Sequence, residues 1–176
     1  KAPHNLYADA SKIYTLTPKG ASRPPQQFVY RSESDAMPTS ASASAGVRLS
    51  MDGVQVSWMW DTASSSYMRW SGKDKHLDAD KTQVASKNVV VLYMVYKASA
   101  ADVRSPEAQS VGEGDAWIYT NGSLVKGKWA RALATDVFNL TDSAGAPIKL
   151  TPGNTWIELP RLNKGADIPT GSDPAK

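Results

Sequence analysis

The sequence has no cysteine, which excludes disulfide bonds, thiolate catalysis and zinc sites built on thiolates. Histidine is almost as scarce, because His4 and His76 are the only two, so a histidine-rich metal site is excluded as well. The longest apolar run, residues 89–96, is too short to cross a bilayer as a helix. With 41% hydrophobic and 21% charged residues, the composition is that of a globular domain. We expect no cofactor.

Neither sign of charge dominates the sequence. Twenty lysines and arginines stand against 17 aspartates and glutamates, and the formal net charge of +3 is spread without a basic stripe or cluster. A protein that binds a nucleic acid needs such a cluster to neutralise the phosphates. We therefore expect no nucleic acid partner. The length of 176 residues fits one ordinary domain.

The motifs of common catalytic sites are also missing. The sequence has no Gly-x-Ser-x-Gly nucleophile motif and no glycine-rich phosphate loop. Asp74, Asp78 and Asp80 could supply oxygen ligands to calcium, but their spacing lacks the glycine and the terminal glutamate of an EF-hand loop. We interpret these aspartates as a solvated acidic turn and expect no metal site.

What the sequence does contain is a series of short strand patterns. In residues 54–60, valine and tryptophan alternate with other side chains, as in a strand with one buried face. Residues 88–96 are apolar on both faces, which is typical of a central strand covered on both sides. Asn121-Gly122 supplies the two positive-φ residues of a type I′ hairpin. The patterns predict a mainly β fold, an open barrel or sandwich-like antiparallel sheet of about nine or ten short strands.

Helical periodicity is almost absent. Residues 8–15 are the one candidate, a short N-terminal helical turn that Asp9 or Ser11 could cap. Residues 32–46 are rich in serine, alanine and proline, and this composition buries too little apolar surface to order a segment strongly. We therefore expect a mobile loop there.

The same signals divide the chain into three parts. We expect residues 1–27 to be the end of a preceding domain or a lead-in segment, residues 28–160 a β-rich C-terminal domain, and residues 161–176 a polar, flexible tail. The chain opens at Lys1 without an initiator methionine or an apolar signal segment. We expect a fragment whose targeting sequence lies upstream.

The most pointed polar segment begins at Tyr67. Tyr67 and Arg69 share one face of an extended strand, and after a turn at Gly72 the side chains of His76 and Asp78 share a face as well. Pairing of the two segments would bring Arg69 to Asp78 and set His76 beside a carboxylate. Such a group could bind an anionic ligand through the arginine, or use the histidine as a general base. It could also be an ion-pair cluster that fixes the hairpin register, which is the interpretation we favour.

Six tryptophans are many for this length, and all lie on expected strands. Most are expected in the core, where each indole N–H needs a partner. Trp60 and Trp70 border the polar segment, so we expect one or both at a groove, where an exposed ring can stack on a sugar. Asp61 and Asp78 could also form a carboxylate pair for glycoside hydrolysis, but the sequence does not fix their separation.

Several short motifs follow one another in a fixed order along residues 2–160. They are Ala2-Pro3-His4-Asn5-Leu6-Tyr7, Tyr67-x-Arg69 with Gly72, His76 and Asp78, Asn88-Val89-Val90-Val91, Gly112-x-Gly114, Gly127-x-Trp129-x-Arg131, Gly145-x-Pro147-Ile148 and Pro152-Gly153-Asn154-Thr155-Trp156. The series resembles the YerB-like family of bacterial lipoproteins. No single motif is specific, and the resemblance rests on their order and spacing.

The resemblance implies an extracytoplasmic protein in two parts, tethered by a lipid at an N-terminus upstream of this sequence. The chain would be the C-terminal part, and the family has no known function. Our leading hypothesis is therefore a non-enzymatic binding or scaffold domain of the bacterial cell envelope, with a polar groove around Tyr67, Arg69, His76 and Asp78. Its partner would be a cell-wall glycan, a peptide or an envelope protein. The rivals are a cell-wall-modifying enzyme with a His76 and Asp78 acid–base site, and a structural cover for the missing N-terminal domain.

Overall fold

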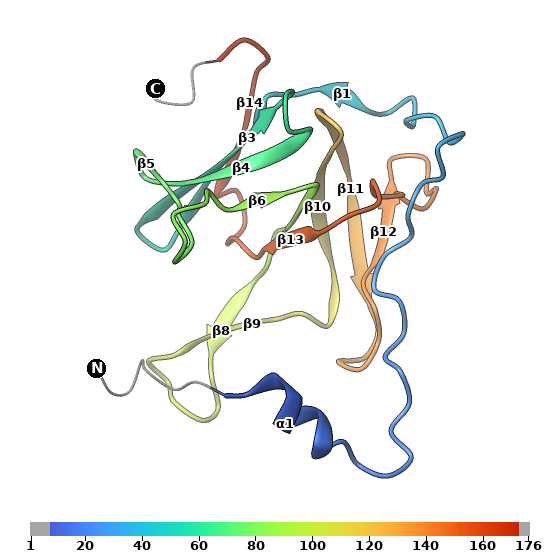
Figure 1. Cartoon of the computed structure of the whole chain (residues 1–176), viewed down its shortest axis with the longest axis vertical. Helices are drawn as coiled ribbons and strands as arrows, with labels where there is room; N and C mark the ends of the chain where they lie inside the picture. The colour runs from blue at the N-terminus through green and yellow to red at the C-terminus, as the bar shows by residue number, and fades with distance from the viewer. Residues whose placement is uncertain (1–7, 173–176) are drawn as a thin grey trace.

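The computed structural model describes residues 8–172, and most of its strands form two sheets that pack against each other (Figure 1). The first sheet has the order β1-β11-β10-β7-β13, and β12 pairs with β11. Its strands are β1 (Ser42–Ala43), β7 (Asn88–Leu92), β10 (Gly112–Thr120), β11 (Ser123–Arg131), β12 (Asn139–Asp142) and β13 (Thr155–Glu158).

The second sheet has the order β14-β2-β3-β4-β5, and β6 pairs with β4. Its strands are β2 (Gly46–Met51), β3 (Val54–Asp61), β4 (Ser66–Ser71), β5 (Asp74–Lys75), β6 (Ala85–Ser86) and β14 (Gly165–Ile168).

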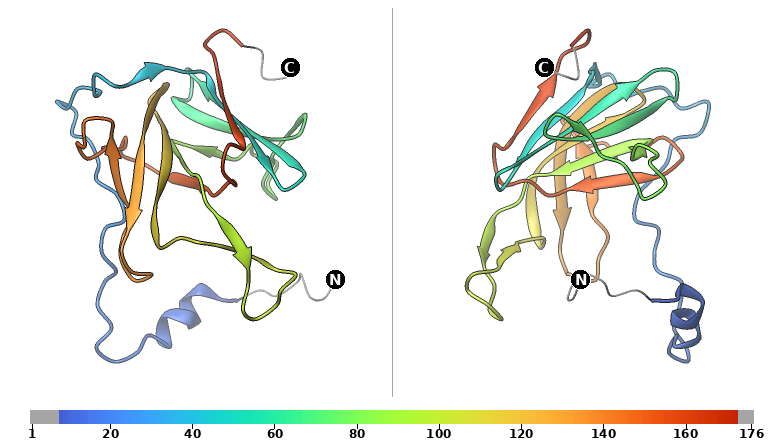
Figure 2. Two further views of the ribbon diagram at one scale, coloured as in Figure 1. Left: turned by 180° about the vertical axis from the view of Figure 1, so that it is seen from behind. Right: turned by 60° about the vertical axis from the view of Figure 1, so that its left-hand side comes forward.

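Two smaller elements extend from one end of this pair of sheets. Strands β8 (Tyr96–Ala98) and β9 (Pro106–Ala108) form a separate hairpin, and helix α1 (Ala10–Thr15) lies beyond it (Figure 2). The structure confirms a mainly β, sandwich-like fold with one short N-terminal helix. The described residues form fourteen strands rather than nine or ten: β1, β5 and β6 are two-residue pairings that no sequence pattern predicts, and β14 lies in the segment expected to be a flexible tail.

Strand β7 lies between two hydrophobic cores, as its apolar pattern predicts. Val90 and Leu92 belong to a core on the outer side of the first sheet. Val89 and Val91 belong to the core between the two sheets, where they meet Trp58 from β3. β7 pairs antiparallel with β10 and parallel with β13. It therefore has a neighbouring strand at each edge and a hydrophobic core on each face.

The β10–β11 hairpin turns at Asn121-Gly122, as the sequence predicts. Asn121 has φ 51° and Gly122 has φ 68°, the left-handed values that a type I′ turn requires at both positions. Residues Thr120 and Ser123 face each other directly across the turn. The ring of Trp60 lies so close to Gly122 that a side chain there would lie 2.9 Å from the indole nitrogen.

Helix α1 confirms the predicted helical turn, and Asp9 rather than Ser11 is its N-cap. The Asp9 carboxylate accepts a hydrogen bond of 2.9 Å from the Ser11 main-chain nitrogen. None of the helical residues is buried. Residues 1–7, which include His4 and the first motif of the family resemblance, lie outside the described part of the chain.

The expected mobile loop at residues 32–46 is partly ordered, which corrects that expectation. Ser42–Ala43 pair with β11, and Ser44 is 1% exposed. The Ser44 hydroxyl donates to Asp167 Oδ1 at 2.5 Å, and it also accepts from the Gly46 nitrogen at 3.0 Å. Low apolar content was a poor guide here, because backbone pairing and short side-chain hydrogen bonds hold the segment instead.

The prediction of a flexible tail from residue 161 is wrong for part of that segment. Gly165–Ile168 form β14, which pairs antiparallel with β2, and Ile168 is 6% exposed. Arg161 also forms an ion pair of 2.6 Å with Asp52. β14 is an edge strand of the second sheet, and polar residues are common in such strands because one edge has no partner strand.

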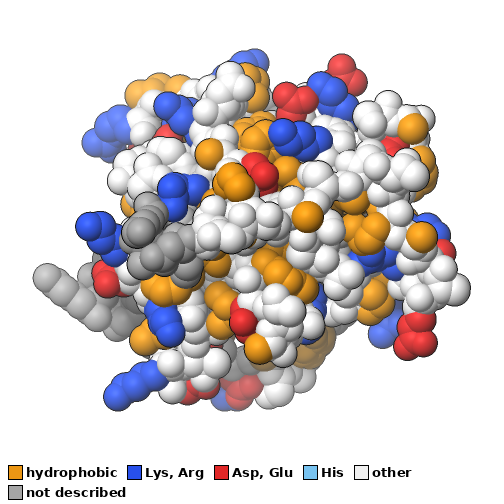
Figure 3. All heavy atoms as spheres, turned by 90° about the horizontal axis from the view of Figure 1, so that it is seen from above, with side chains coloured by type: hydrophobic (Ala, Val, Ile, Leu, Met, Phe, Trp, Pro, Cys, Tyr) orange, Lys and Arg blue, Asp and Glu red, His pale blue; other side chains and the backbone are white. Residues whose placement is uncertain are grey.

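Within residues 8–172, no helix is long and apolar enough to cross a membrane. The same residues contain no group of three or more His, Asp or Glu side chains placed to hold a metal ion. On the face seen from above, basic and acidic side chains are scattered, and small hydrophobic areas lie between them (Figure 3). That mixture of signs agrees with the even distribution of charge along the sequence.

Candidate functional site

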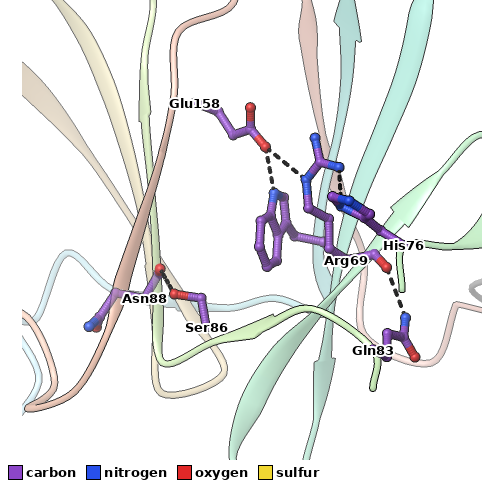
Figure 4. A network of polar contacts seen from close by, with 7 residues as sticks. Arg69, His76, Gln83, Ser86, Asn88 and Glu158 are labelled. Carbon is purple, nitrogen blue, oxygen red and sulfur yellow. Dashed lines mark hydrogen bonds and ion pairs between the residues drawn. The ribbon is translucent and has the colours of Figure 1, made fainter. Parts of the chain in front are cut away.

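Arg69 is the centre of the polar cluster that the sequence points to. It lies on β4 with its side chain directed toward the first sheet, between Glu158 and His76 (Figure 4). Its Nε donates to Glu158 Oε1 at 3.4 Å, and its Nη1 lies 2.6 Å from His76 Nδ1. Because a guanidinium can only donate, the His76 Nδ1 accepts and the ring proton is on Nε2.

Two tryptophans enclose the arginine head group. The guanidinium carbon lies 5.7 Å from the centre of the Trp58 ring and 5.2 Å from that of Trp156, which are cation–π distances. The two rings are 5.2 Å apart and tilted by 54°. Trp58 also donates its indole N–H to Glu158 Oε1 at 2.9 Å, so a single carboxylate oxygen serves both donors.

This cluster joins the two sheets of the fold. Arg69 belongs to β4 of the second sheet and Glu158 to β13 of the first. Their side chains are 13% and 6% exposed, so the ion pair is almost wholly withdrawn from water. A buried charge requires a partner, and each of these two is the other's partner. We conclude that the arrangement is structural and leaves Arg69 little capacity for an anionic ligand.

The backbone around His76 is fixed by the same strand. The Arg69 carbonyl accepts from the His76 nitrogen at 3.0 Å and from Gln83 Nε2 at 2.9 Å. The His76 carbonyl accepts from the Val84 nitrogen at 2.8 Å. The segment between β4 and β6 therefore folds back onto β4 and sets His76 opposite Arg69.

Asp78 does not join the cluster, which corrects the prediction that Arg69 reaches it. The Asp78 side chain is exposed and accepts at 2.6 Å from the Ala79 nitrogen within its own turn. Within the described part of the chain, the carboxylate that meets Arg69 is Glu158. Sequence reasoning missed Glu158 because 89 residues separate it from Arg69. The available signal was a lone acidic residue in the apolar segment Thr155–Leu159.

Tyr67 lies away from any ligand surface, whereas Asp61 lies at the edge of one. Tyr67 is fully buried, its hydroxyl donates to the Ser123 carbonyl at 3.4 Å, and burial raises its pKa. Asp61 accepts from the nitrogen and the hydroxyl of Ser64, and these hydrogen bonds lower its pKa. Asp61 therefore remains a carboxylate at the end of β3, beside the groove described next.

A groove lies on the outer face of the second sheet, the face turned away from β7. Its volume is about 370 Å³, and its lining residues are Met59, Trp60, Asp61, Met68, Trp70, Lys75 and Gln83. Met59 and Met68 stand directly opposite each other on β3 and β4. Trp70 is half-buried, and Lys75 Nζ lies 5.9 Å from the centre of its ring. The floor of the groove is thus apolar and its rim is polar.

The two tryptophans predicted for a groove differ in their role. Trp70 faces the outer groove, and its indole nitrogen has no hydrogen-bond partner within residues 8–172. Trp60 borders the same groove, but its ring packs against that of Tyr67 in the core, with ring centres 4.9 Å apart and planes tilted by 56°. Among the other tryptophans, Trp58 and Trp129 are buried, as expected for core residues.

These features define a β-sandwich-like domain with a buried ion pair between its sheets and an aromatic groove on one outer face. The chain belongs to the family described as protein of unknown function (DUF3048) C-terminal domain, which matches residues 46–157. No curated protein matches the sequence significantly.

Among solved structures, the chain is similar to the YerB protein from Bacillus subtilis, with a TM-score of 0.70 and 16% sequence identity. The match covers 95% of this chain but 56% of that one, so the chain spans little more than half of the YerB protein. The YerB-like resemblance predicted from the motif order is therefore confirmed as to family and fold.

Proposed function

We propose that this chain is a non-enzymatic binding domain of the bacterial cell envelope, and that a cell-wall glycan lies in the groove above Trp70. The observation that carries the proposal is the contrast between two polar regions. Arg69 and Glu158 satisfy each other in the interior, whereas Trp70 and two methionines line an open groove with Lys75 at its rim. We therefore assign ligand binding to the groove, and the contact between the two sheets to the ion pair.

A glycan fits the mixed chemistry of the groove. One face of a pyranose carries C–H groups and packs on an aromatic or thioether floor, while the hydroxyls at its edge need hydrogen-bonding partners. Trp70, Met59 and Met68 form such a floor. Gln83 uses its Nε2 on the Arg69 carbonyl, which leaves its Oε1 as an acceptor, and Asp61 and Lys75 add an acceptor and a donor.

The cell envelope is the location that we infer from the family resemblance. The motif order of the YerB-like lipoproteins supports an extracytoplasmic protein held by a lipid upstream of this sequence. The absence of cysteine agrees with that location but does not require it. Envelope proteins of this kind meet peptidoglycan at high local concentration, so a shallow groove of modest affinity is sufficient.

The rival acid–base site is less well supported by the geometry. A general base needs its orienting partner and its substrate within hydrogen-bonding reach. His76 Nδ1 is occupied by Arg69, and the Asp78 carboxylate accepts from its own turn. An enzyme at this position would have to break the contact of His76 with a buried arginine.

Retention on purified, insoluble peptidoglycan tests the proposal. We expect Trp70→Ala to weaken retention about tenfold, because loss of one stacked ring removes on the order of 1.4 kcal/mol. Tyr14→Ala removes another aromatic ring, one that is 79% exposed on α1, and serves as the matched control with unchanged retention. Equal retention of parent and Trp70→Ala would overturn the groove assignment. Release of soluble muropeptides by the parent, lost in His76→Ala, would favour the enzyme.

We propose the structural-cover role as the second candidate, because α1 exposes apolar side chains. Ile13, Tyr14 and Leu16 are 55%, 79% and 78% exposed, and the helix buries none of its residues. The measurement is hydrogen exchange of residues 10–15 in this chain and in a longer chain that includes a preceding domain. Slower exchange in the longer chain supports the role, and equal exchange in both contradicts it.

A further inference from the structure

Strand β13 is the last strand of the first sheet, and one of its two edges has no neighbouring strand. Its other edge pairs with β7. There the Asn88 nitrogen donates to the Asn154 carbonyl at 3.2 Å, and the Met94 nitrogen donates to the Pro160 carbonyl at 2.9 Å. Because successive residues of a strand direct their N–H and C=O groups to opposite edges, the even-numbered residues of this segment face β7. The odd-numbered residues therefore face outward.

Four backbone groups in a row lack partners at this outward edge. They are the N–H and C=O groups of Thr155 and of Ile157, none of which forms a hydrogen bond within residues 8–172. The next outward carbonyl, that of Leu159, already accepts from the Tyr96 hydroxyl at 2.7 Å. The Ile157 side chain is 38% exposed, as expected for an edge that solvent reaches. Thr155–Ile157 thus form an open edge with two donors and two acceptors.

The open edge also lacks the residues that protect other edge strands. β5 is Asp74–Lys75, β9 begins with Pro106, and β14 contains Asp167. Charged residues and prolines at such positions hinder pairing with strands of other chains. Thr155–Ile157 contain neither, and the one charged residue of β13, Glu158, is in the buried ion pair. The open edge is therefore available for a further strand.

We propose that a second copy of this chain pairs with the open edge, antiparallel, about a twofold axis at Trp156. In that register Thr155 of one copy faces Ile157 of the other, and each such pair exchanges two hydrogen bonds. All four free groups of each copy are then satisfied, while the Leu159 carbonyl keeps its bond from Tyr96. A twofold interface requires this kind of self-complementary surface, because the same residues lie on both sides of it.

The side chains of the open edge suit a second copy as well. Thr155 and Ile157 are β-branched, and such residues pack well as neighbours across strands. Trp156 is half-buried and would lie opposite its own counterpart, in the type of pair where side chains approach most closely. No charge in residues 155–157 opposes its copy. These residues do not line the groove above Trp70, so the inference does not depend on the proposed function.

Sedimentation velocity of the chain from about 10 μM to about 1 mM tests the inference. We expect a monomer–dimer equilibrium, with slower hydrogen exchange of the Thr155 and Ile157 amides where the dimer predominates. Ile157→Pro removes an outward N–H that β7 does not use, so the dimer loses two of its four hydrogen bonds. Its association should weaken by about tenfold or more. Ile157→Val keeps the N–H and is the matched control with unchanged association.

Ile157→Lys is the second variant, because it keeps the backbone and adds a charge at the edge, and it should also weaken the dimer. A chain that stays monomeric up to about 1 mM would overturn the inference. A dimer that survives in both the proline and the lysine variant would do the same. So would binding of a synthetic peptide of residues 153–159 to a chain that does not self-associate, because the open edge would then be a site for a foreign strand.

Discussion

Glu158 is the residue on which the union of the two sheets most depends. One oxygen of the Glu158 carboxylate accepts hydrogen bonds from both Arg69 and Trp58, and Glu158 is only 5% exposed. Removing one partner of a buried pair leaves the other charge in a poor environment, which is far more costly than losing a surface pair. The cluster therefore has a measurable energetic signature.

Substitution of Glu158 by alanine should lower the free energy of unfolding by about 3–5 kcal/mol, because the Arg69 guanidinium would remain buried without its counter-ion. Urea denaturation followed by tryptophan fluorescence measures the change. Arg104→Met is the control, because Arg104 is 88% exposed in its pair with Asp102 and should change stability by about 0–1 kcal/mol. A loss below about 1 kcal/mol in Glu158→Ala would mean that water reaches Arg69.

The sequence indicates which residues belong to the polar cluster and the groove, but not which residues contact each other. It drew attention to Arg69 and His76, which do meet, and to Trp70, which does border a groove. It paired Arg69 with Asp78, because local spacing can only relate residues within one hairpin. The carboxylate that arrives from 89 residues away depends on how β13 packs, which no local pattern reports.

Among the secondary-structure elements, a tight turn fixes which residues of two adjacent strands face each other. The Asn121-Gly122 turn aligns nine residue pairs between β10 and β11, and it also receives the ring of Trp60 from the second sheet. The turn thus links a local conformation to a contact between sheets. Gly72 has a similar positive φ of 60°, but nothing lies within 4 Å of the position where its side chain would begin.

Substituting the two glycines therefore distinguishes the cost of backbone strain from the cost of a steric clash. We expect Gly72→Ala to cost about 1–2 kcal/mol, the usual penalty for a left-handed residue with a side chain. Gly122→Ala should cost clearly more, because the added carbon also meets the Trp60 indole nitrogen at 2.9 Å. Thermal unfolding of both variants gives the comparison. Equal losses would show that the Trp60 ring moves aside freely.

The strand patterns predicted the elements better than they predicted their neighbours. The two-faced apolar run of β7 and the positive-φ turn of β10–β11 follow from local chemistry and are confirmed. The parallel pairing of β13 with β7 and the edge strand β14 were not foreseen. β13 and β14 are short, and their anchoring contacts are distant in sequence: Glu158 of β13 meets Arg69 across 89 positions, and Asp167 of β14 meets Ser44 across 123.

In the whole molecule, one sheet holds the fold together with its inner face, and we propose that it binds a ligand with its outer face. The inner face of the second sheet carries Trp58 and Arg69, which hold the first sheet. The outer face carries Met59, Met68 and Trp70, which line the groove. Because side chains alternate along a strand, β3 and β4 can serve both purposes with neighbouring residues.

The most direct test of this division is an NMR titration with soluble peptidoglycan fragments that follows the methionine methyl groups and the His76 ring. Of the five methionines, Met59 and Met68 line the groove, so we expect their methyl signals to shift while the His76 signals stay in place. Shifts at His76 with unchanged signals at Met59 and Met68 would contradict it, because the ligand would then meet the residues that we assign to holding the sheets together.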